Sequence, residues 1–178
     1  MLRLFVAIAI PVEAAAPLLA LRQGLVGVSW SPPVNLHLTL RFVGEVAEPV
    51  ADDLDAELGA IMAGPIEVRL AGVGVFNGPG GINSLWAGVE ASDPLNRLQR
   101  RCERAARRAG LRSETRAWRP HVTLAYARDA SVDRIGAWLA TSNLVRPPPF
   151  TARTFGLYSS RRADGASVYR LEQSYRLG

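Results

Sequence analysis

The feature that most constrains the fold of this chain is a repeat centred on one tetrapeptide, His-x-Thr-Leu, which occurs at residues 37–40 and again at residues 121–124. Three further residue types recur at the same distance after each histidine. They are Pro65 and Pro149 after 28 residues, Arg69 and Arg153 after 32, and Gly72 and Gly156 after 35. A repeat of this length predicts two related lobes, each of which supplies one copy of the tetrapeptide.

The order of the expected elements indicates the same division, because each copy precedes a helix, a proline, a strand, a turn and a second strand. After the first copy these elements are a helix over 48–63 and strands over 66–76 and 84–90 around a turn at 77–81. After the second copy they are a helix marked by Val132, Ile135 and Leu139, and strands over 150–158 and 167–175 around a turn at 164–165.

Three more elements complete the predicted architecture. They are a strand over 2–10, a helix over 11–23 and a helix that begins at Asp93-Pro94, with Asp93 as its cap, and ends at Gly110. Length and composition fit one globular domain over residues 1–178. We therefore expect one α+β domain of two lobes, with its pocket in the groove between them.

Each tetrapeptide places an imidazole and a hydroxyl side by side. Both copies lie in runs of aliphatic and β-branched residues, which favour strands. In a strand, residues i and i+2 share a face, so His37 pairs with Thr39 and His121 pairs with Thr123. Near neutral pH one histidine can act as a general base while a second, protonated histidine acts as a general acid. Two threonine hydroxyls can hold phosphate oxygens, so the pattern favours phosphoryl chemistry without a metal.

The alternative for these histidines is that both are satisfied core residues in unrelated strands. They are the only two histidines of the chain, and both stand in the same motif. This favours a single divided site. A metal-dependent hydrolase is a second alternative, with His and Asp52, Asp53 or Asp55 as ligands, but those acids are expected on the outer face of a helix. Cys102, the one cysteine, gives no zinc-ligand spacing with the histidines, so we expect neither metal nor cofactor.

Charge divides the chain as well. Residues 1–96 hold 4 arginines and 10 acidic residues, a net charge of −6, whereas residues 97–178 hold 17 arginines and 6 acidic residues, a net charge of +11. Six of these arginines lie on the helix after Asp93, where they form a basic face that is either solvated or in contact with RNA phosphates. If the partner is a polyanion, we expect the C-terminal half to face it.

The first residues contain an apolar run followed by alanines, which superficially imitates a signal peptide. Pro11 ends that run and Glu13 lies next to the would-be cleavage site, so a buried first strand explains the segment better. No apolar stretch reaches the roughly 20 residues of a spanning helix. We therefore expect a cytoplasmic protein without a membrane partner, most simply a monomer.

Four segments together resemble the two-histidine (2H) phosphoesterase superfamily, and within it the RNA 2′,3′-cyclic phosphodiesterase branch, historically called 2′-5′ RNA ligase. They are FVAIAIP at 5–11, NLHLTLRFVGE at 35–45, LWAG at 85–88 and RPHVTL at 119–124. The resemblance implies a bilobal, pseudo-twofold fold of two mostly antiparallel sheets around a groove with the helices outside, and no metal or cofactor. It further implies hydrolysis of RNA 2′,3′-cyclic phosphate ends to 2′-phosphate ends, with tRNA fragments among the candidate RNAs.

By the same resemblance, His37 is the proton donor, His121 is the proton acceptor, and Thr39 and Thr123 hold the nonbridging phosphate oxygens. The residues alone leave the acid and base assignments exchangeable. The family often has an arginine just after the second motif, whereas here Arg128 comes later and is a weaker candidate for a phosphate contact. Tyr126 is expected on the face of His121 and Thr123, where it can stack on a base or be an ordinary strand aromatic. Reversible 2′-5′ ligation, small cyclic nucleotides and a non-catalytic RNA-binding module stay open as alternatives.

Overall fold

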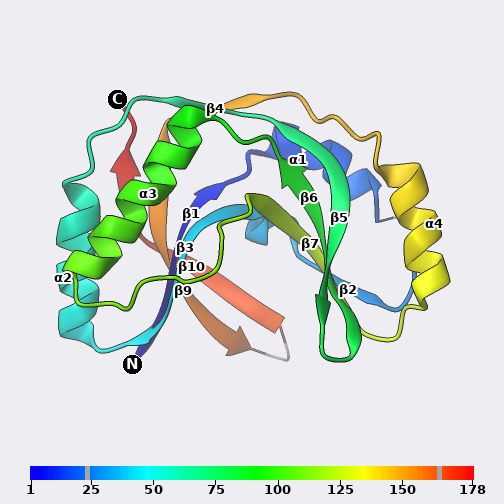
Figure 1. Ribbon diagram of the computed structural model, residues 1–178, viewed down its shortest axis with the longest axis horizontal. Coiled ribbons are helices and arrows are strands. Elements are labelled where there is room, and N and C mark those ends of the chain that lie inside the picture. The colour runs from blue at the N-terminus through cyan, green and yellow to red at the C-terminus, as the bar shows by residue number, and fades with distance from the viewer. Residues whose placement is uncertain (23–24, 164–165) are drawn as a thin grey trace.

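The computed structural model describes residues 1–22, 25–163 and 166–178. The helices are α1 (Val12–Ala20), the 3₁₀ turn η1 (Pro33–Asn35), α2 (Glu48–Gly59), α3 (Asp93–Arg108) and α4 (Val132–Ser142). The strands are β1 (Leu2–Ala9), β2 (Val28–Trp30), β3 (His37–Val46), β4 (Ile66–Val68), β5 (Leu70–Gly78), β6 (Gly81–Val89), β7 (His121–Ala127), β8 (Phe150–Ala152), β9 (Thr154–Ala163) and β10 (Ala166–Arg176). The α+β class predicted from the sequence is confirmed (Figure 1).

The main sheet is antiparallel and has the strand order β10-β9-β1-β3-β7-β6-β5, and β2 pairs with β7 along the same edge as β3, beyond the single β3–β7 contact. Its two halves meet between β3 and β7, where Leu38 opposite Val122 is the one paired position. The expected two sheets are therefore β10-β9-β1-β3 and β2-β7-β6-β5, joined at their centre. Each half contains one motif strand, which gives the pseudo-twofold arrangement.

Segments are exchanged between the two halves. The hairpin β5–β6 follows the first motif in sequence but pairs with β7, and the hairpin β9–β10 follows the second motif but pairs with β1 beside β3. The chain crosses between the halves at β4 and β8, which pair with each other in a separate two-stranded sheet. A spatial lobe is therefore not one half of the sequence, and neither motif has a complete sheet without the other half of the chain.

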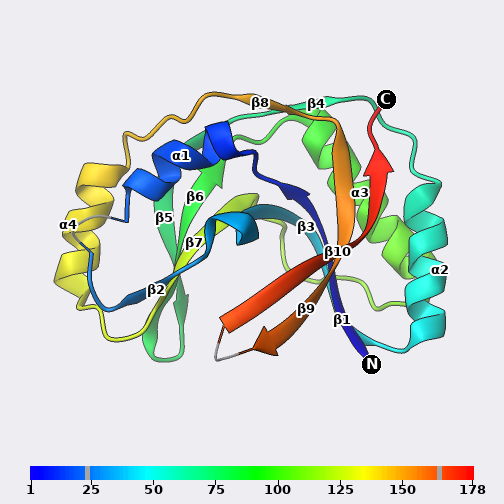
Figure 2. The same ribbon diagram turned by 180° about the vertical axis from the view of Figure 1, so that it is seen from behind.

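Helices cover the outer faces of the two halves (Figures 1 and 2). α2 and α3 pack together over the half that contains β3, while α1 and α4 lie on the half that contains β7. The core between α3 and its sheet is apolar: Leu95, Leu98 and Cys102 are at most 1% exposed. Burial of these side chains favours folding by roughly 25 cal/mol per Å² of apolar surface and fixes the back of the motif strand.

Several predicted boundaries were wrong. The helix predicted over 48–63 ends at Gly59, since glycine is a poor helix former, and the chain then extends toward β4. The single strands predicted over 66–76 and 150–158 are each divided, at Arg69 and Arg153, where the chain leaves the β4–β8 pair for the main sheet.

The caps and turns differ in detail from the predictions. Ser92, not Asp93, caps α3: its hydroxyl accepts from the Leu95 amide at 3.4 Å, and Asp93 is the first helical residue. The first helix ends at Ala20, and the predicted end at Gln23 and turn at 164–165 lie outside the described residues. No helix in the described part of the chain combines the length and the apolar character that crossing a bilayer requires.

Candidate active site

The two motifs lie next to each other at the centre of the main sheet. Leu38 and Val122 form the pair between β3 and β7 and are fully buried, so their faces point into the core. The neighbouring side chains in each strand point to the opposite face. Since the strands are antiparallel, His37 of β3 lies beside Thr123 of β7, and Thr39 of β3 lies beside His121 of β7. The four predicted polar side chains are thereby brought to one face of the sheet.

Both imidazoles are oriented by backbone in the same way. His37 Nδ1 lies 2.6 Å from the carbonyl oxygen of Asn35, and His121 Nδ1 lies 2.7 Å from that of Arg119. A carbonyl only accepts, so in each ring Nδ1 carries the hydrogen and donates it. The neutral ring then has its free lone pair on Nε2. Each histidine therefore keeps one nitrogen available to accept or donate a proton.

Aromatic rings enclose both histidines. The centroids of Phe5 and Tyr169 lie 4.8 and 5.2 Å from that of His37, and the centroids of Phe76 and Trp86 lie 4.7 and 6.3 Å from that of His121. Burial lowers the pKa of both histidines below the usual value. The carbonyl hydrogen bonds oppose that shift, and the charge of His121 lowers the pKa of His37 further. The two imidazoles therefore disfavour simultaneous protonation.

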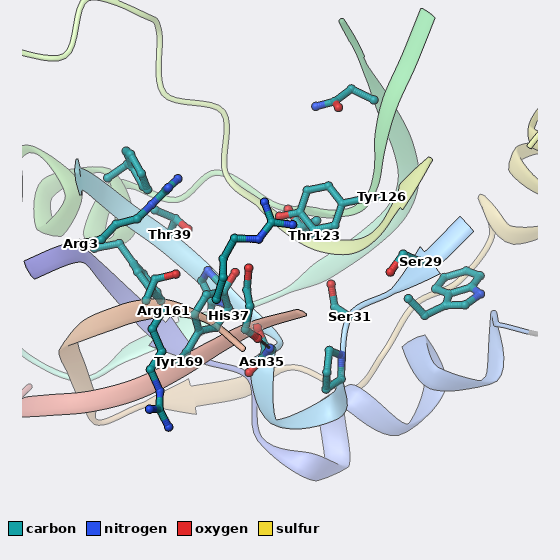
Figure 3. Close-up of a pocket in the computed structure, with 18 of the residues that line it drawn as sticks. Arg3, Ser29, Ser31, Asn35, His37, Thr39, Thr123, Tyr126, Arg161 and Tyr169 are labelled. Carbon is teal, nitrogen blue, oxygen red and sulfur yellow. Dashed lines mark hydrogen bonds between the residues drawn. The ribbon is translucent and has the colours of Figure 1, made fainter. Parts of the chain in front are cut away.

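A cavity of about 530 Å³ opens over this face (Figure 3). His37, Thr39, Thr123, Tyr126 and Arg128 line it, so five of the six predicted site residues share one cavity. His121, the first residue of β7, is outside the lining, and its ring lies against Phe76 and Trp86. The site is therefore asymmetric around two equivalent motifs.

Tyr126 lies on the face of Thr123, as predicted. The alternation of a regular strand does not explain this, because residues three positions apart point to opposite faces. The register of β7 against β6 shifts between Thr123 and Ala125, so Leu124 is an extra residue and Tyr126 turns back to the cavity. The same bulge occurs at Leu40 in β3 and turns Phe42 to the cavity. Phe42 and Tyr126 are 46% and 43% exposed and flank the site as a matched aromatic pair.

The bulge at Leu40 also turns Arg41 away from the cavity. Its side chain is 9% exposed, and its Nε lies 2.6 Å from Glu103 of α3 in an ionic contact without hydrogen-bond alignment. Its Nη2 donates to the carbonyl of Arg112 at 2.5 Å. In the same loop, the Trp118 indole donates to the carbonyl of Thr39 at 3.0 Å. These two hydrogen bonds hold the loop between α3 and His121 against β3.

The sequence analysis missed several lining residues. They are mainly Arg3, Phe5 and Phe42 of the β1–β3 pair, Ser29 and Ser31 near β2, Asn35 before His37, and Ser160, Arg161, Arg162 and Tyr169 of the β9–β10 hairpin. Phe42 could have been found, because it follows His37 by five residues as Tyr126 follows His121. The hairpin residues had no such signal, because the exchange of hairpins brings them to His37 from more than 120 residues away.

Tyr126 and Tyr169 come from the two halves of the sheet and approach each other across the cavity (Figure 3). Burial raises the pKa of Tyr126, and the neighbouring Tyr169 phenol raises it further, while Arg3 opposes the shift. The Tyr126 phenol therefore stays a protonated donor near neutral pH. No group of three or more His, Cys, Asp or Glu side chains within 1–22, 25–163 and 166–178 is arranged to hold a metal ion.

This chain is similar in sequence and in structure to known proteins. A family model described as the 2′-5′ RNA ligase superfamily matches residues 7–164. An RNA 2′,3′-cyclic phosphodiesterase of Archaeoglobus fulgidus is 32% identical over 126 residues, which cover 69% of this chain and 71% of the relative. Another, of Aeropyrum pernix, is 37% identical over 97 residues, 54% of this chain and 55% of the relative, so that match spans about half of each protein. The crystal structure of E. coli LigT complexed with 3′-AMP superposes with a TM-score of 0.78 at 26% identity, covering 99% and 97% of the two chains.

Proposed function

Because this chain belongs to the 2′-5′ RNA ligase superfamily, we propose that it is a phosphoesterase that hydrolyses RNA 2′,3′-cyclic phosphate ends to 2′-phosphate ends. The observation that carries the proposal is the matched pair of imidazoles. Each has its Nδ1 committed to a backbone carbonyl, and both belong to strands whose hydroxyls share their face. Relatives named RNA 2′,3′-cyclic phosphodiesterase support the same reaction.

In the proposed reaction, water attacks the phosphorus of the cyclic phosphate. Nε2 of His121 accepts a proton from this water as the P–O bond forms. The bond from phosphorus to the ribose 3′ oxygen breaks, and Nε2 of His37 donates a proton to that oxygen. The products are a 3′-hydroxyl and a 2′-phosphate, and the proton returns from His121 to His37 through solvent. Acid and base are both side chains, so the mechanism uses no metal or cofactor.

The remaining groups bind the charge that develops on the phosphate. The hydroxyls of Thr39 and Thr123 donate to the two nonbridging oxygens, one from each motif strand. Arg128 lines the cavity and supplies positive charge at longer range. Tyr126, on the cavity wall, offers its ring to the terminal base.

The lowered pKa values of the histidines fit an exchange of one proton between two sites. Burial keeps one ring neutral, as the base requires. The substrate phosphate is an anion, and an opposite charge nearby favours the charged form of an imidazole. Bound substrate is therefore expected to raise the pKa of the donor ring and to provide the acid.

A small nucleoside 2′,3′-cyclic phosphate is the second candidate substrate, because a cavity of about 530 Å³ lies within the usual range for sites that bind one small ligand. Ligation of RNA ends through a 2′-5′ bond would use the same groups, with a ribose hydroxyl in the place of water. We expect hydrolysis to prevail where water fills the open cavity. Fragments of tRNA with cyclic phosphate ends are candidate substrates.

We further propose that residues 1–178 act as one bilobal domain and as a monomer. Each motif strand pairs with a hairpin from the other half of the sequence, so the separate halves would each lack part of a sheet. The cavity likewise takes its lining from both halves, and no second copy is needed to complete it.

The test is incubation of the purified protein, with EDTA present, on a short RNA ending in a 2′,3′-cyclic phosphate, with 2′- and 3′-phosphate products resolved. We expect a 2′-phosphate. Replacement of His37 or His121 by alanine should lower turnover by about 10²- to 10⁴-fold while the thermal unfolding midpoint stays within a few degrees. An unchanged rate in either variant would refute the two-histidine mechanism, and a 3′-phosphate product would refute the leaving-group assignment.

A further inference from the structure

A stripe of arginines covers the outside of α3. Six arginines point from this helix away from the core: Arg97, Arg100, Arg101, Arg104, Arg107 and Arg108. At about 100° per residue they fall within an arc of about 120°, opposite the buried Leu95, Leu98 and Cys102. Five of the six are exposed, and Arg101 is half-buried and donates to the carbonyl of Met62. The helix is about 24 Å long, so the stripe presents positive charge over several nucleotide lengths.

Acidic side chains hardly interrupt this stripe. Neighbouring arginines stand three or four residues apart, a spacing at which like charges destabilise a helix. In the described part of the chain, Arg108 is the one member that pairs with an acid, Glu57 at 3.2 Å. Glu103, the one acid within the helix beyond its first turn, is turned to the buried Arg41. An anion bound from outside would therefore reduce the repulsion between these arginine charges.

The loop that follows α3 carries further arginines toward the candidate active site. The loop between α3 and β7 carries three more exposed arginines, Arg112, Arg116 and Arg119, of which Arg116 contacts Glu114 at 3.4 Å. The carbonyl of Arg112 accepts from Arg41, whose neighbour Phe42 lines the cavity, and the loop is fixed to Thr39 through Trp118. Arg119 stands two residues before His121, with its guanidinium 5.8 Å from the centre of the Phe76 ring. Figure 1 shows this loop returning from the end of α3 to β7.

We propose that these nine arginines, the arginine track, bind the phosphate backbone of the RNA at nucleotides distant from the reacting end. Arginine suits this role because its guanidinium donates to two phosphate oxygens at once. The contacts are to phosphates and not to bases, so they increase affinity without selecting a sequence. This inference rests on the proposed function for its ligand, an RNA chain. It adds a binding surface outside the cavity, which distinguishes a long RNA from a mononucleotide.

The test compares two variants of equal charge. The track variant replaces Arg100, Arg104 and Arg107 by glutamine. The control variant replaces Arg134, Arg153 and Arg176, three exposed arginines on other elements, by glutamine. Each loses three positive charges. None of these residues lines the 530 Å³ cavity, and all are exposed, so both variants are expected to fold.

The primary readout is equilibrium binding of a labelled single-stranded RNA of about 12 nucleotides ending in a 3′-phosphate, measured as salt is raised from about 50 to 200 mM. Three lost phosphate contacts should reduce the slope of log K against log salt by about 2 in the track variant and weaken binding roughly tenfold at the higher salt. The control variant should match the wild type. Hydrolysis of a nucleoside 2′,3′-cyclic phosphate should be the same in all three proteins.

Equal affinity and equal slope in the track and control variants would overturn the proposal. So would loss of mononucleotide hydrolysis in the track variant alone, because the track would then act on the site and not on the RNA chain. If the wild type hydrolyses neither substrate but the track variant still loses salt-dependent binding, the proposed function fails and the RNA surface stands.

Discussion

The substitution Trp118→Phe tests whether the loop before His121 positions the reacting groups. The Trp118 indole donates to the carbonyl of Thr39 at 3.0 Å, and this loop also provides the Arg119 carbonyl that orients His121. Phenylalanine keeps an aromatic ring in the half-buried position and removes the indole donor, and the control described below corrects for the loss of ring volume. The Thr39 carbonyl lies where β3 and β7 have already diverged from their one paired position, so β7 does not replace the lost bond.

A neutral hydrogen bond contributes about 0.5–1.5 kcal/mol net, and we expect Trp118→Phe to lower the free energy of unfolding by about 1 kcal/mol. The effect on catalysis should be separate and at least as large. Thr39 and His121 are both held through this contact, and small displacements of reacting groups cost much of their effect. We expect kcat to fall roughly tenfold, which corresponds to about 1.4 kcal/mol of transition-state stabilisation.

Trp138→Phe is the matched control. The Trp138 indole makes the same kind of bond, to the carbonyl of Leu21 at 2.9 Å, between α4 and the end of α1. Urea unfolding should show a similar loss of stability in both variants, while steady-state hydrolysis of the cyclic phosphate should be slowed only by Trp118→Phe. If the two variants lose stability alike and both keep wild-type kcat, the positioning role of the loop is refuted.

Four further predictions concern the site and its support. The pH profile of kcat/KM should be a bell with its maximum below about pH 6.5, because burial lowers the pKa of both His37 and His121, and a maximum above that pH would contradict the assignment. For the same reason the folded protein binds fewer protons than the unfolded chain, so the free energy of unfolding should fall as pH decreases below about 6.5, and urea titrations should show a shallower fall when both histidines are replaced. Thr123→Val keeps the shape but removes a phosphate donor and should lower kcat by about 10²-fold in steady-state assays without a change in the urea midpoint; an unchanged rate would exclude this hydroxyl from the mechanism. Arg41→Met leaves the buried Oε2 of Glu103 without its ionic partner and should cost about 3 kcal/mol in urea unfolding, much of which the added change Glu103→Met should restore; no recovery would show that the ion pair is not the cause.

The core of the site could be predicted because its signals are local. A strand places residues i and i+2 on one face whatever surrounds it, so His37 with Thr39 and His121 with Thr123 follow from two short segments. The division into two related halves also follows from residue spacing. The residue types near the ends of helices did not determine where each helix begins. Ser92 and Asp93 are both good caps, and only the position of the first helical turn selects Ser92.

The bulges mark the limit of local prediction within the motif strands. Strict alternation would put Arg41 on the face of His37 and Tyr126 on the face opposite His121. One extra residue in each strand, Leu40 and Leu124, reverses both. A bulge is set by pairing with the neighbouring strand, β1 or β6, and the motif sequence alone does not encode it.

The sequence by itself determined the two motifs, the strand character that aligns each histidine with a threonine, and the concentration of arginine in the second half of the chain. The motifs and their strand character depend on residues within a few positions of one another, and the charge distribution depends on composition alone. Only the tertiary structure decided that the hairpins are exchanged, so that Tyr169 and Arg161 of β9–β10 line the cavity beside His37. The physical reason is that a hairpin can pair with any sheet edge that is free, and the edges beside β1 and β7 are brought within its reach only by the fold of the whole chain. That choice involves hydrogen bonds and burial summed over the whole sheet.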